Sequence, residues 1–268
     1  MSPGGDDVSP AHPLEERWTV GTDDAELLLD DDHLHARIAC ARGELVARVS
    51  AALVADHPSA VARLLLETPA AALLARRGYC VLHAGGVTGP GGAVVIRGSP
   101  SAGKSTLVAA AYRAGLGVLG DESVLAARND PDDLLAAVRD ITVLPDTRRL
   151  LGIDDAHTAP AGGTEAKRRL DLFASSTPAV RRARRAATIV LGSRNGGPAR
   201  LEPLTPETCL REFRLGRIAQ EQWSGTPEHA AEHWSRSGAY RLSGTADLVG
   251  AVGLLAGLVS RPAAARPA

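Results

Sequence analysis

Residues with the types and spacing needed to bind phosphate follow a short apolar run at positions 93–96. The segment Gly98-Ser-Pro-Ser-Ala-Gly-Lys-Ser105 fits the pattern G-x-x-x-x-G-K-[ST] at every fixed position. In this pattern the backbone N–H groups of a glycine-rich loop surround phosphate oxygens, the lysine reaches the β- and γ-phosphates, and the serine hydroxyl can bind Mg²⁺. The sequence therefore predicts a site for a nucleoside triphosphate and Mg²⁺.

The segments on either side of the loop suit this chemistry. The β-branched run before it predicts a buried strand, residues 106–114 predict a helix that Gly115 ends, and residues 116–120 predict a second strand. The positive end of the helix dipole would lie at the loop. The residues expected to contact the nucleotide are Gly98, Ser99, Pro100, Ser101, Ala102, Gly103, Lys104, Ser105 and Thr106.

Lysine usage singles out two positions. The chain has 30 lysine and arginine residues, of which only Lys104 and Lys167 are lysines. A lysine in such a chain indicates that a compact point charge is needed. Gly162 and Gly163 would let the loop that carries Lys167 close over a nucleotide, so Lys167 joins Lys104 as a candidate catalytic residue. The alternative interpretation of Lys167 is an ordinary solvated side chain.

Polar residues also flank the loop on the neighbouring predicted strands. Asp121 ends the strand after the loop helix, which we expect to lie beside the loop strand, and it could hold a metal through water or accept a proton. Ser105, Asp121 and Glu122 are the predicted metal-binding residues. His83 lies on a predicted strand at 79–84, and Gly89–Gly92 predicts a tight turn into the loop strand. The two strands are therefore expected to be antiparallel, in a mixed sheet.

Three motifs in this order resemble the catalytic core of the HPr kinase/phosphorylase family. They are His83-Ala-Gly-Gly-Val87, the glycine loop and Leu119-Gly-Asp-Glu122, and together they span about a sixth of the chain. The resemblance implies a mixed-sheet α/β P-loop kinase core of the type shared by the HPr kinase C-terminal domain and phosphoenolpyruvate carboxykinases. It also implies homo-oligomers.

The same resemblance implies an activity and roles for the matched residues. The activity is ATP-dependent transfer of the γ-phosphoryl group to a hydroxyl. Asp121 matches the catalytic aspartate that deprotonates the acceptor, and His83 matches the histidine that assists it. Lys104 and Ser105 match the phosphate-binding and magnesium-binding residues.

The chain also departs from the family pattern. Glu122 stands where the family usually has a second aspartate, and the downstream signature tied to phosphorolysis of phosphoserine has no counterpart. The nearest basic segment is 162–171. This argues against the reverse reaction and against HPr itself as substrate. The expected acceptor is a serine of a peptide or protein, or a small-molecule hydroxyl.

Two other functions remain as alternatives. A P-loop ATPase or GTPase without an acceptor would need a water-positioning residue and a switch loop, which no motif marks. A remote alternative is a zinc hydrolase, because His229-Ala-Ala-Glu-His233 fits H-x-x-E-H, although only Asp247 follows as a further acidic ligand. The basic run Arg181–Arg185 has no interleaved aromatic residues and is interpreted as a solvated entry to a strand.

Composition limits the partners and the compartment. The chain of 268 residues is 44% hydrophobic with a net charge of −1, which predicts a packed core and no field that would attract nucleic acid or a membrane surface. Cys40, Cys80 and Cys209 form no C-x-x-C pair, which favours a reducing cytoplasm over a disulfide scaffold. The apolar run 248–259 is too short to span a bilayer.

The chain divides into four predicted parts. Short apolar runs separated by turn formers predict a small antiparallel sheet near the N-terminus, so residues 17–78 are expected to form a small N-terminal α/β subdomain. Residues 79–259 form the predicted kinase domain. Residues 1–16, which lack the apolar stretch of a signal peptide, and residues 260–268 are predicted to be disordered tails.

Overall fold

A computed structural model describes most of the chain. The described residues are 19–20, 26–31, 34–39, 42–56, 58–136, 140–154, 158–160, 167–171, 180–192, 196–215, 221 and 227–260. The predicted tails (apart from Ser260), Cys40, Gly162 and Gly163 lie outside these residues. The chain forms two compact units, Met1–His57 and Pro58–Ala268.

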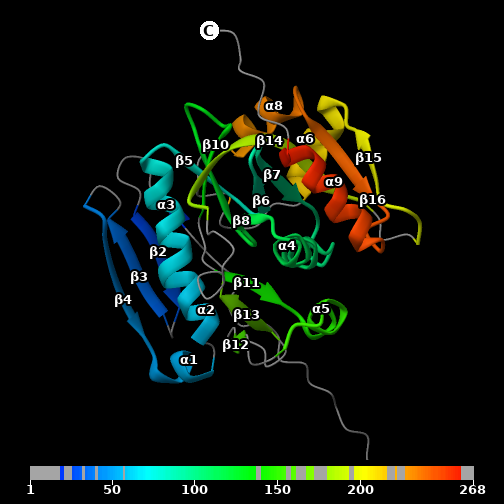
Figure 1. Ribbon diagram of the computed structural model, residues 1–268. Coiled ribbons are helices and arrows are strands. Elements are labelled where there is room, and N and C mark those ends of the chain that lie inside the picture. Colours follow the sequence, from blue (N-terminus) through cyan, green and yellow to red (C-terminus); the bar gives the residue numbers. More distant parts are fainter. Residues whose placement is uncertain are drawn as a thin grey trace, which may run out of the picture. The chain divides into compact units, whose positions relative to one another are not determined.

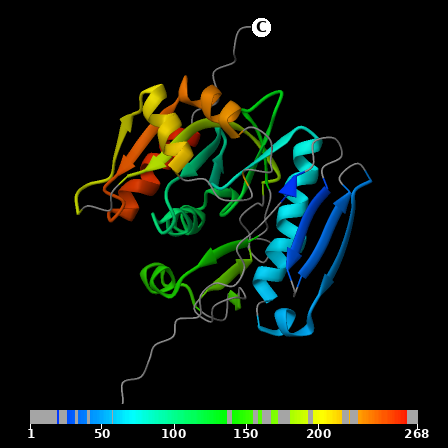
Figure 2. The ribbon, with the colours of Figure 1, turned by 180° about the vertical axis from the view of Figure 1, so that it is seen from behind.

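The N-terminal unit contains the predicted antiparallel sheet. Strands β1 (Thr19–Val20), β2 (Glu26–Asp31), β3 (Leu34–Ala39) and β4 (Glu44–Val49) pair in sequence order, each antiparallel to the next. Figure 2 shows the four strands from behind. In β3 the side chains alternate between buried and exposed, as a period of two requires. Helix α1 (Ala51–Asp56) follows β4.

The helices after His57 belong to the second unit. They are α2 (Pro58–Ala62), a π-helical segment (Arg63–Glu67) and α3 (Thr68–Arg76). Ala71 of α3 packs with Val81 and Leu125 of the central sheet described next. The division therefore falls between residues 57 and 58 and not, as the sequence suggested, between 78 and 79, because the apolar face of α3 is buried on that sheet.

The central sheet of the second unit is mixed, as predicted. Its strands run in the order β5-β9-β10-β14-β7-β6-β8, and β16, paired with β15, lies beside the C-terminal half of β14. Strand β14 is parallel to both β7 and β16, whereas the other pairs are antiparallel. The strands are β5 (Tyr79–Leu82), β6 (Gly85–Gly89), β7 (Gly92–Arg97), β8 (Gly117–Gly120), β9 (Val124–Ala127), β10 (Asp133–Ala136), β14 (Arg182–Leu191), β15 (Arg200–Pro203) and β16 (Ala239–Ser243).

Strand β6 corrects two details of the predicted topology. The predicted strand 79–84 ends at Leu82, and the turn at residues 90–91 joins β7 to β6 instead. Because β6 also pairs with β8, the strand that leads to Asp121 is not adjacent to the loop strand, and that prediction is wrong. The glycines of β6 permit this insertion: a Cβ on Gly85 would come within 2.7 Å of Val108 Cγ2.

Helices cover both faces of the central sheet (Figure 1). Val94 and Ile96 of β7 belong to a core cluster with α4 (Lys104–Arg113) and α9 (Leu248–Ser260). The alternate residues, Ala93 and Val95, belong to a second cluster with α6 (Pro206–Leu215) and α8 (Pro227–Ser235). The loop strand is thus buried on both sides, which explains its continuous apolar sequence.

A smaller sheet lies near the N-terminal end of α4. Its strands are ordered β11 (Asp140–Val143), β13 (Arg168–Asp171) and β12 (Thr158–Pro160), all antiparallel, and α5 (Pro145–Leu151) follows β11. Ile141 and Val143 of β11 point into the core cluster of α4. Because β11 is an edge strand of this sheet, the backbone N–H of Thr142 can bond a group outside the sheet, and it donates to Asp121.

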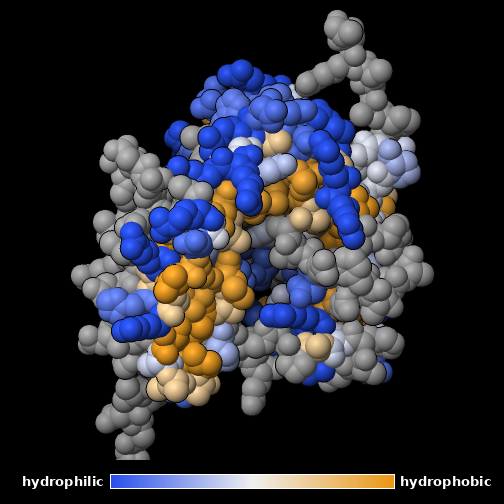
Figure 3. Space-filling model, turned by 90° about the vertical axis from the view of Figure 1, so that its left-hand side faces the viewer, coloured by the Kyte–Doolittle hydropathy of each residue, from blue (hydrophilic) through white to orange (hydrophobic). Residues whose placement is uncertain are grey.

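The edge strand β4 exposes apolar side chains. Val46 is 70% exposed and Leu45 36%. Figure 3 views the side on which β4 lies in Figure 1 and shows a broad apolar area there. An exposed strand edge with apolar side chains favours association; the homo-oligomer implied by the family resemblance stays a prediction. Within the described segments, no helix is both long and apolar enough to cross a bilayer.

Gly120, the last residue of β8, lies where the backbone leaves no room for a side chain. A Cβ at this position would overlap the backbone carbonyl oxygen of Ser123. We expect Gly120→Ala to lower the free energy of unfolding by about 1–3 kcal/mol, measured by urea denaturation. Gly253→Ala in α9 is the control, because a Cβ there meets open space. Equal stability of the two variants would contradict the tight turn after β8.

Candidate functional site

The glycine loop connects β7 to α4, as the sequence predicts. Strand β7 ends at Arg97 and helix α4 begins at Lys104. Gly103, the residue before the helix, has a φ of +99°, and Ser101 is the one non-glycine residue of the described chain with a positive φ, +62°. Such a backbone conformation in a non-glycine residue is uncommon and tends to occur at functional sites. The loop turns its backbone sharply just where α4 begins.

The side chain of Lys104 lies against its own loop. It is only 7% exposed, and its Nζ donates to the carbonyl oxygens of Gly98 at 2.8 Å and Ser99 at 3.3 Å. Burial, followed by the positive charge of Arg97, lowers its pKa from the usual lysine value. Among the described residues, the hydrogen-bond partners of this buried ammonium are neutral carbonyl oxygens, so it would gain from an anion at the same position.

Asp121 is buried in spite of its charge, at the end of β8. Its side chain is 1% exposed, and Oδ2 accepts a hydrogen bond from the Thr142 N–H at 2.9 Å. Burial raises the pKa of Asp121 to about 7, although the Thr142 hydrogen bond and the nearby Ser105 side chain both act to lower it. Oδ1 is buried and has no hydrogen-bond partner among the described residues. The structure thus brings Asp121 to the loop although β6 separates their strands.

His83 lies between β5 and β6, and its imidazole faces the end of β8. Its Nδ1 is 2.9 Å from the carbonyl oxygen of Glu122. Because a carbonyl can only accept, Nδ1 carries the proton and Nε2 carries the lone pair. Burial and then the charge of Lys104 lower the pKa of His83 to about 4. His83 is therefore a neutral imidazole at neutral pH, with a hydrogen-bond acceptor at Nε2.

The oxygen-bearing residues predicted to hold Mg²⁺ do not form a complete cage. Asp121 offers the partnerless oxygen and Ser105 its hydroxyl, whereas Glu122 is exposed. In the described part of the chain, no three His, Cys, Asp or Glu residues are grouped to hold a metal. This donor set fits Mg²⁺, which takes one or two protein ligands and completes its shell with phosphate oxygens and water.

Two further predicted residues lie at the rim of the loop and on the small sheet. Thr106 Oγ1 is 2.7 Å from Thr147 Oγ1, which joins the first turn of α4 to α5. Lys167 is exposed and immediately precedes β13, in which Arg169 pairs with Thr142 of β11. Lys167 thus lies just before the strand next to the one that anchors Asp121, and its catalytic role stays a prediction.

The basic run 181–185 is paired with acidic residues of the segment 130–133. Arg182 donates to both oxygens of Asp133, at 2.7 and 2.6 Å, and Arg184 pairs with Asp130. Arg185 Nε lies 2.7 Å from Asp132 Oδ1, and this arginine is 3% exposed. The interpretation of the run as a solvated strand entry is therefore wrong for Arg185. These pairs balance the charges of Arg182, Arg184 and Arg185 with carboxylates, and the absence of a nucleic-acid partner stays a prediction.

The zinc-like motif is divided between two environments. His229 is exposed on α8, whereas His233 Nε2 lies 3.1 Å from Asp132 Oδ2, in the same network as Arg185. The carboxylate of Asp132, which His233 contacts, therefore already forms an ion pair with Arg185. Among the described residues, nothing joins the two histidines to a third metal ligand.

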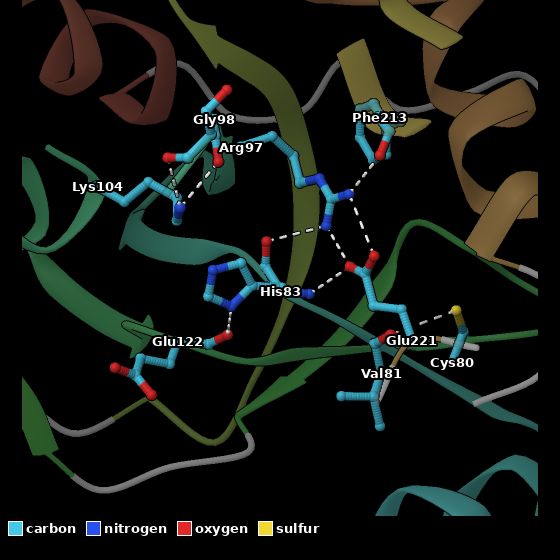
Figure 4. A network of polar contacts seen from close by, with 10 residues as sticks. Cys80, Val81, His83, Arg97, Gly98, Lys104, Glu122, Phe213 and Glu221 are labelled. Atoms are coloured by element: carbon cyan, nitrogen blue, oxygen red, sulfur yellow. Dashed lines mark hydrogen bonds and ion pairs between the residues drawn. The ribbon is translucent and has the colours of Figure 1, made fainter. Parts of the chain in front are cut away.

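Three residues of the site were missed by sequence reasoning. Arg97 and Glu221 form a buried ion pair beside His83, and Thr142 anchors Asp121 (Figure 4 shows the ion pair). The one available signal was Arg97, a charged residue directly after the apolar run 93–96. Glu221 stands in a polar segment with no pattern, and Thr142 acts through its backbone, so neither leaves a mark in the sequence.

Comparison with known proteins does not assign the chain to a family. No family model matches the sequence, and no curated protein sequence does. Any function for the site therefore has to be argued from the residues and geometry described above.

The raised pKa of Asp121 makes stability depend on pH. An unfolded aspartate loses its proton near pH 4, but the folded carboxyl keeps it until about pH 7. Folding is therefore penalised increasingly between pH 4 and 7, by up to about 1.4 kcal/mol per pH unit. We expect Asp121→Asn, which cannot ionise, to gain stability relative to the wild type over this range.

Urea denaturation of both proteins in EDTA at several pH values measures this effect. Other titrating groups are common to both proteins and cancel in the difference. The difference should be constant below about pH 4, grow in favour of Asp121→Asn up to about pH 7, and then level off. A difference that does not change between pH 4 and 8 would show that Asp121 has an ordinary pKa.

Proposed function

We propose that the protein is an ATP-dependent kinase that transfers the γ-phosphoryl group to a hydroxyl, of a serine in a peptide or protein or of a small molecule. The observation that carries the proposal is the buried Asp121, which lies near Ser105 of the glycine loop and retains one oxygen without a hydrogen-bond partner among the described residues. Burying such a carboxylate costs free energy, and a role in chemistry accounts for that cost.

The loop side of the site supplies positive potential for phosphate. Residues 98–105 contain Lys104, the backbone N–H groups of the loop and the N-terminal end of α4, which begins at Lys104. Ser105 and Asp121 would hold Mg²⁺, which neutralises charge on the transferred phosphoryl group when bound. For Lys104 to reach a phosphate, its Nζ would exchange the carbonyls of Gly98 and Ser99 for phosphate oxygens.

The strand side of the site supplies groups for the acceptor. With a pKa of about 7, Asp121 is a suitable base for the proton of a hydroxyl at neutral pH. The neutral His83 ring can accept a hydrogen bond at Nε2, and so could orient the same hydroxyl. An ATPase or GTPase would use the same loop but needs no acceptor, and it is distinguished by its product.

Incubation with Mg²⁺ and ATP tests the proposal. Candidate acceptors are serine-containing peptides and small hydroxyl compounds, and mass spectrometry detects the addition of a phosphate. We expect a phosphorylated acceptor formed in equal amount with ADP. Release of ADP and inorganic phosphate, with every acceptor unmodified, would support the hydrolase alternative instead.

Two substitutions separate binding from chemistry. We expect Lys104→Ala to weaken ATP binding about tenfold or more, a loss of ~1.4 kcal/mol. Asp121→Asn should retain binding and lose about 10²- to 10⁴-fold in phosphoryl transfer, because it removes the base. Fluorescence titration with a labelled ATP analogue measures the first effect and the mass assay the second. Wild-type turnover by Asp121→Asn would exclude Asp121 as the base.

A further inference from the structure

A buried ion pair stands at the base of the glycine loop. Arg97 is the last residue of β7, and Glu221 lies 124 positions further along the chain. Their side chains are 1% and 0% exposed. One guanidinium nitrogen of Arg97 bonds Glu221 Oε1, and the other lies 3.3 Å from Oε2. The guanidinium and the carboxylate therefore face each other through two parallel N···O contacts.

Both partners of this pair also bond the backbone of His83. The His83 N–H donates to Glu221 Oε1 at 2.6 Å, and the His83 carbonyl accepts from Arg97 at 2.9 Å (Figure 4). His83 belongs to neither β5 nor β6. At this residue the ion pair takes the place of the strand partners that hold the backbone elsewhere in the sheet.

The guanidinium of Arg97 is also fixed by Phe213. It donates to the carbonyl oxygen of Phe213 at 2.7 Å and lies 4.8 Å from the centre of the Phe213 ring. A buried ion pair is a poor source of stability, because desolvation of both charges offsets their attraction. Because the Arg97–Glu221 pair bonds both the N–H and the carbonyl of His83, its role is to position that residue.

We propose that the Arg97–Glu221 ion pair is a positioning device that clamps the backbone of His83 and so orients its imidazole toward the acceptor side of the candidate site. This inference rests on the proposed kinase function for the role of His83, but not for the clamp itself. Arg97 and Glu221 are positioning residues, since they act through His83. Arg97 also directly precedes Gly98, whose carbonyl holds Lys104, so one strand end serves both sides of the site.

The chain contains a matched control for this pair. Arg185 and Asp132 form a second buried ion pair, and the guanidinium of Arg185 lies 5.6 Å from the centre of the Trp234 ring. This pair also contacts a histidine, because His233 Nε2 is 3.1 Å from Asp132 Oδ2. The two pairs share burial, charge and aromatic contact, but only Arg97–Glu221 borders the glycine loop.

The test compares Glu221→Gln with Asp132→Asn in protein labelled at its histidines. Both variants should have lower urea midpoints, because each leaves a buried arginine uncompensated. Heteronuclear NMR should show the ring signals of His83 shifted in Glu221→Gln and unchanged in Asp132→Asn, and the reverse for His233. Unshifted His83 signals in Glu221→Gln would overturn the proposal. If Glu221→Gln does not fold, Arg97→Lys replaces it, with the same expected shift of His83.

Kinetics give a second readout, using the acceptor found by the mass assay. Glu221→Gln should lower kcat at least tenfold and change the Kd of the labelled ATP analogue less than threefold, whereas Asp132→Asn should change both less than threefold. An equal loss of kcat in both variants would show a merely structural role and overturn the inference. If no acceptor is phosphorylated, the kinase proposal fails, and the NMR comparison still decides whether the pair positions His83.

Discussion

The burial of the Asp121 carboxylate is the constraint on which the rest of the site depends. A carboxylate that is 1% exposed has lost nearly all its hydration, and the hydrogen bond from the Thr142 N–H and the nearby Ser105 side chain offset only part of that loss. For both groups to reach Asp121, the end of β8, the strand β11 and the glycine loop must converge. The partnerless Oδ1 is then available to a metal or an acceptor.

Two other buried ion pairs of the second unit each balance their own charges. Arg97 and Glu221 neutralise each other beside His83, and Arg185 and Asp132 do so in a second network. The positive charge of Lys104 is therefore the charge that the loop can offer to an anion. His83 is neutral because its burial and the positive charge of the neighbouring Lys104 both oppose protonation of the imidazole.

Features that depend on neighbouring residues could be predicted from the sequence. Features that depend on contacts between residues far apart in the chain could not. The strand, loop and helix at 92–113 follow from one motif and its apolar flanks, and the antiparallel N-terminal sheet from its alternation. The insertion of β6 between β7 and β8 could not be predicted, because no local sequence pattern fixes which strands become neighbours. Glu221 reaches His83 from 138 positions away. The arginine run and the acidic segment 130–133 were both visible, but their pairing was not.

The most direct test of the account is the pKa of Asp121 with and without Mg²⁺ and a non-hydrolysable ATP analogue, measured by carbon NMR of the carboxyl group. Without ligand we expect a pKa of about 7. Binding should lower it by at least about one unit, because a nearby cation favours the ionised carboxyl. A pKa that is ordinary without ligand, or one that the bound complex leaves unchanged, would contradict the claim that Asp121 and the glycine loop form one site.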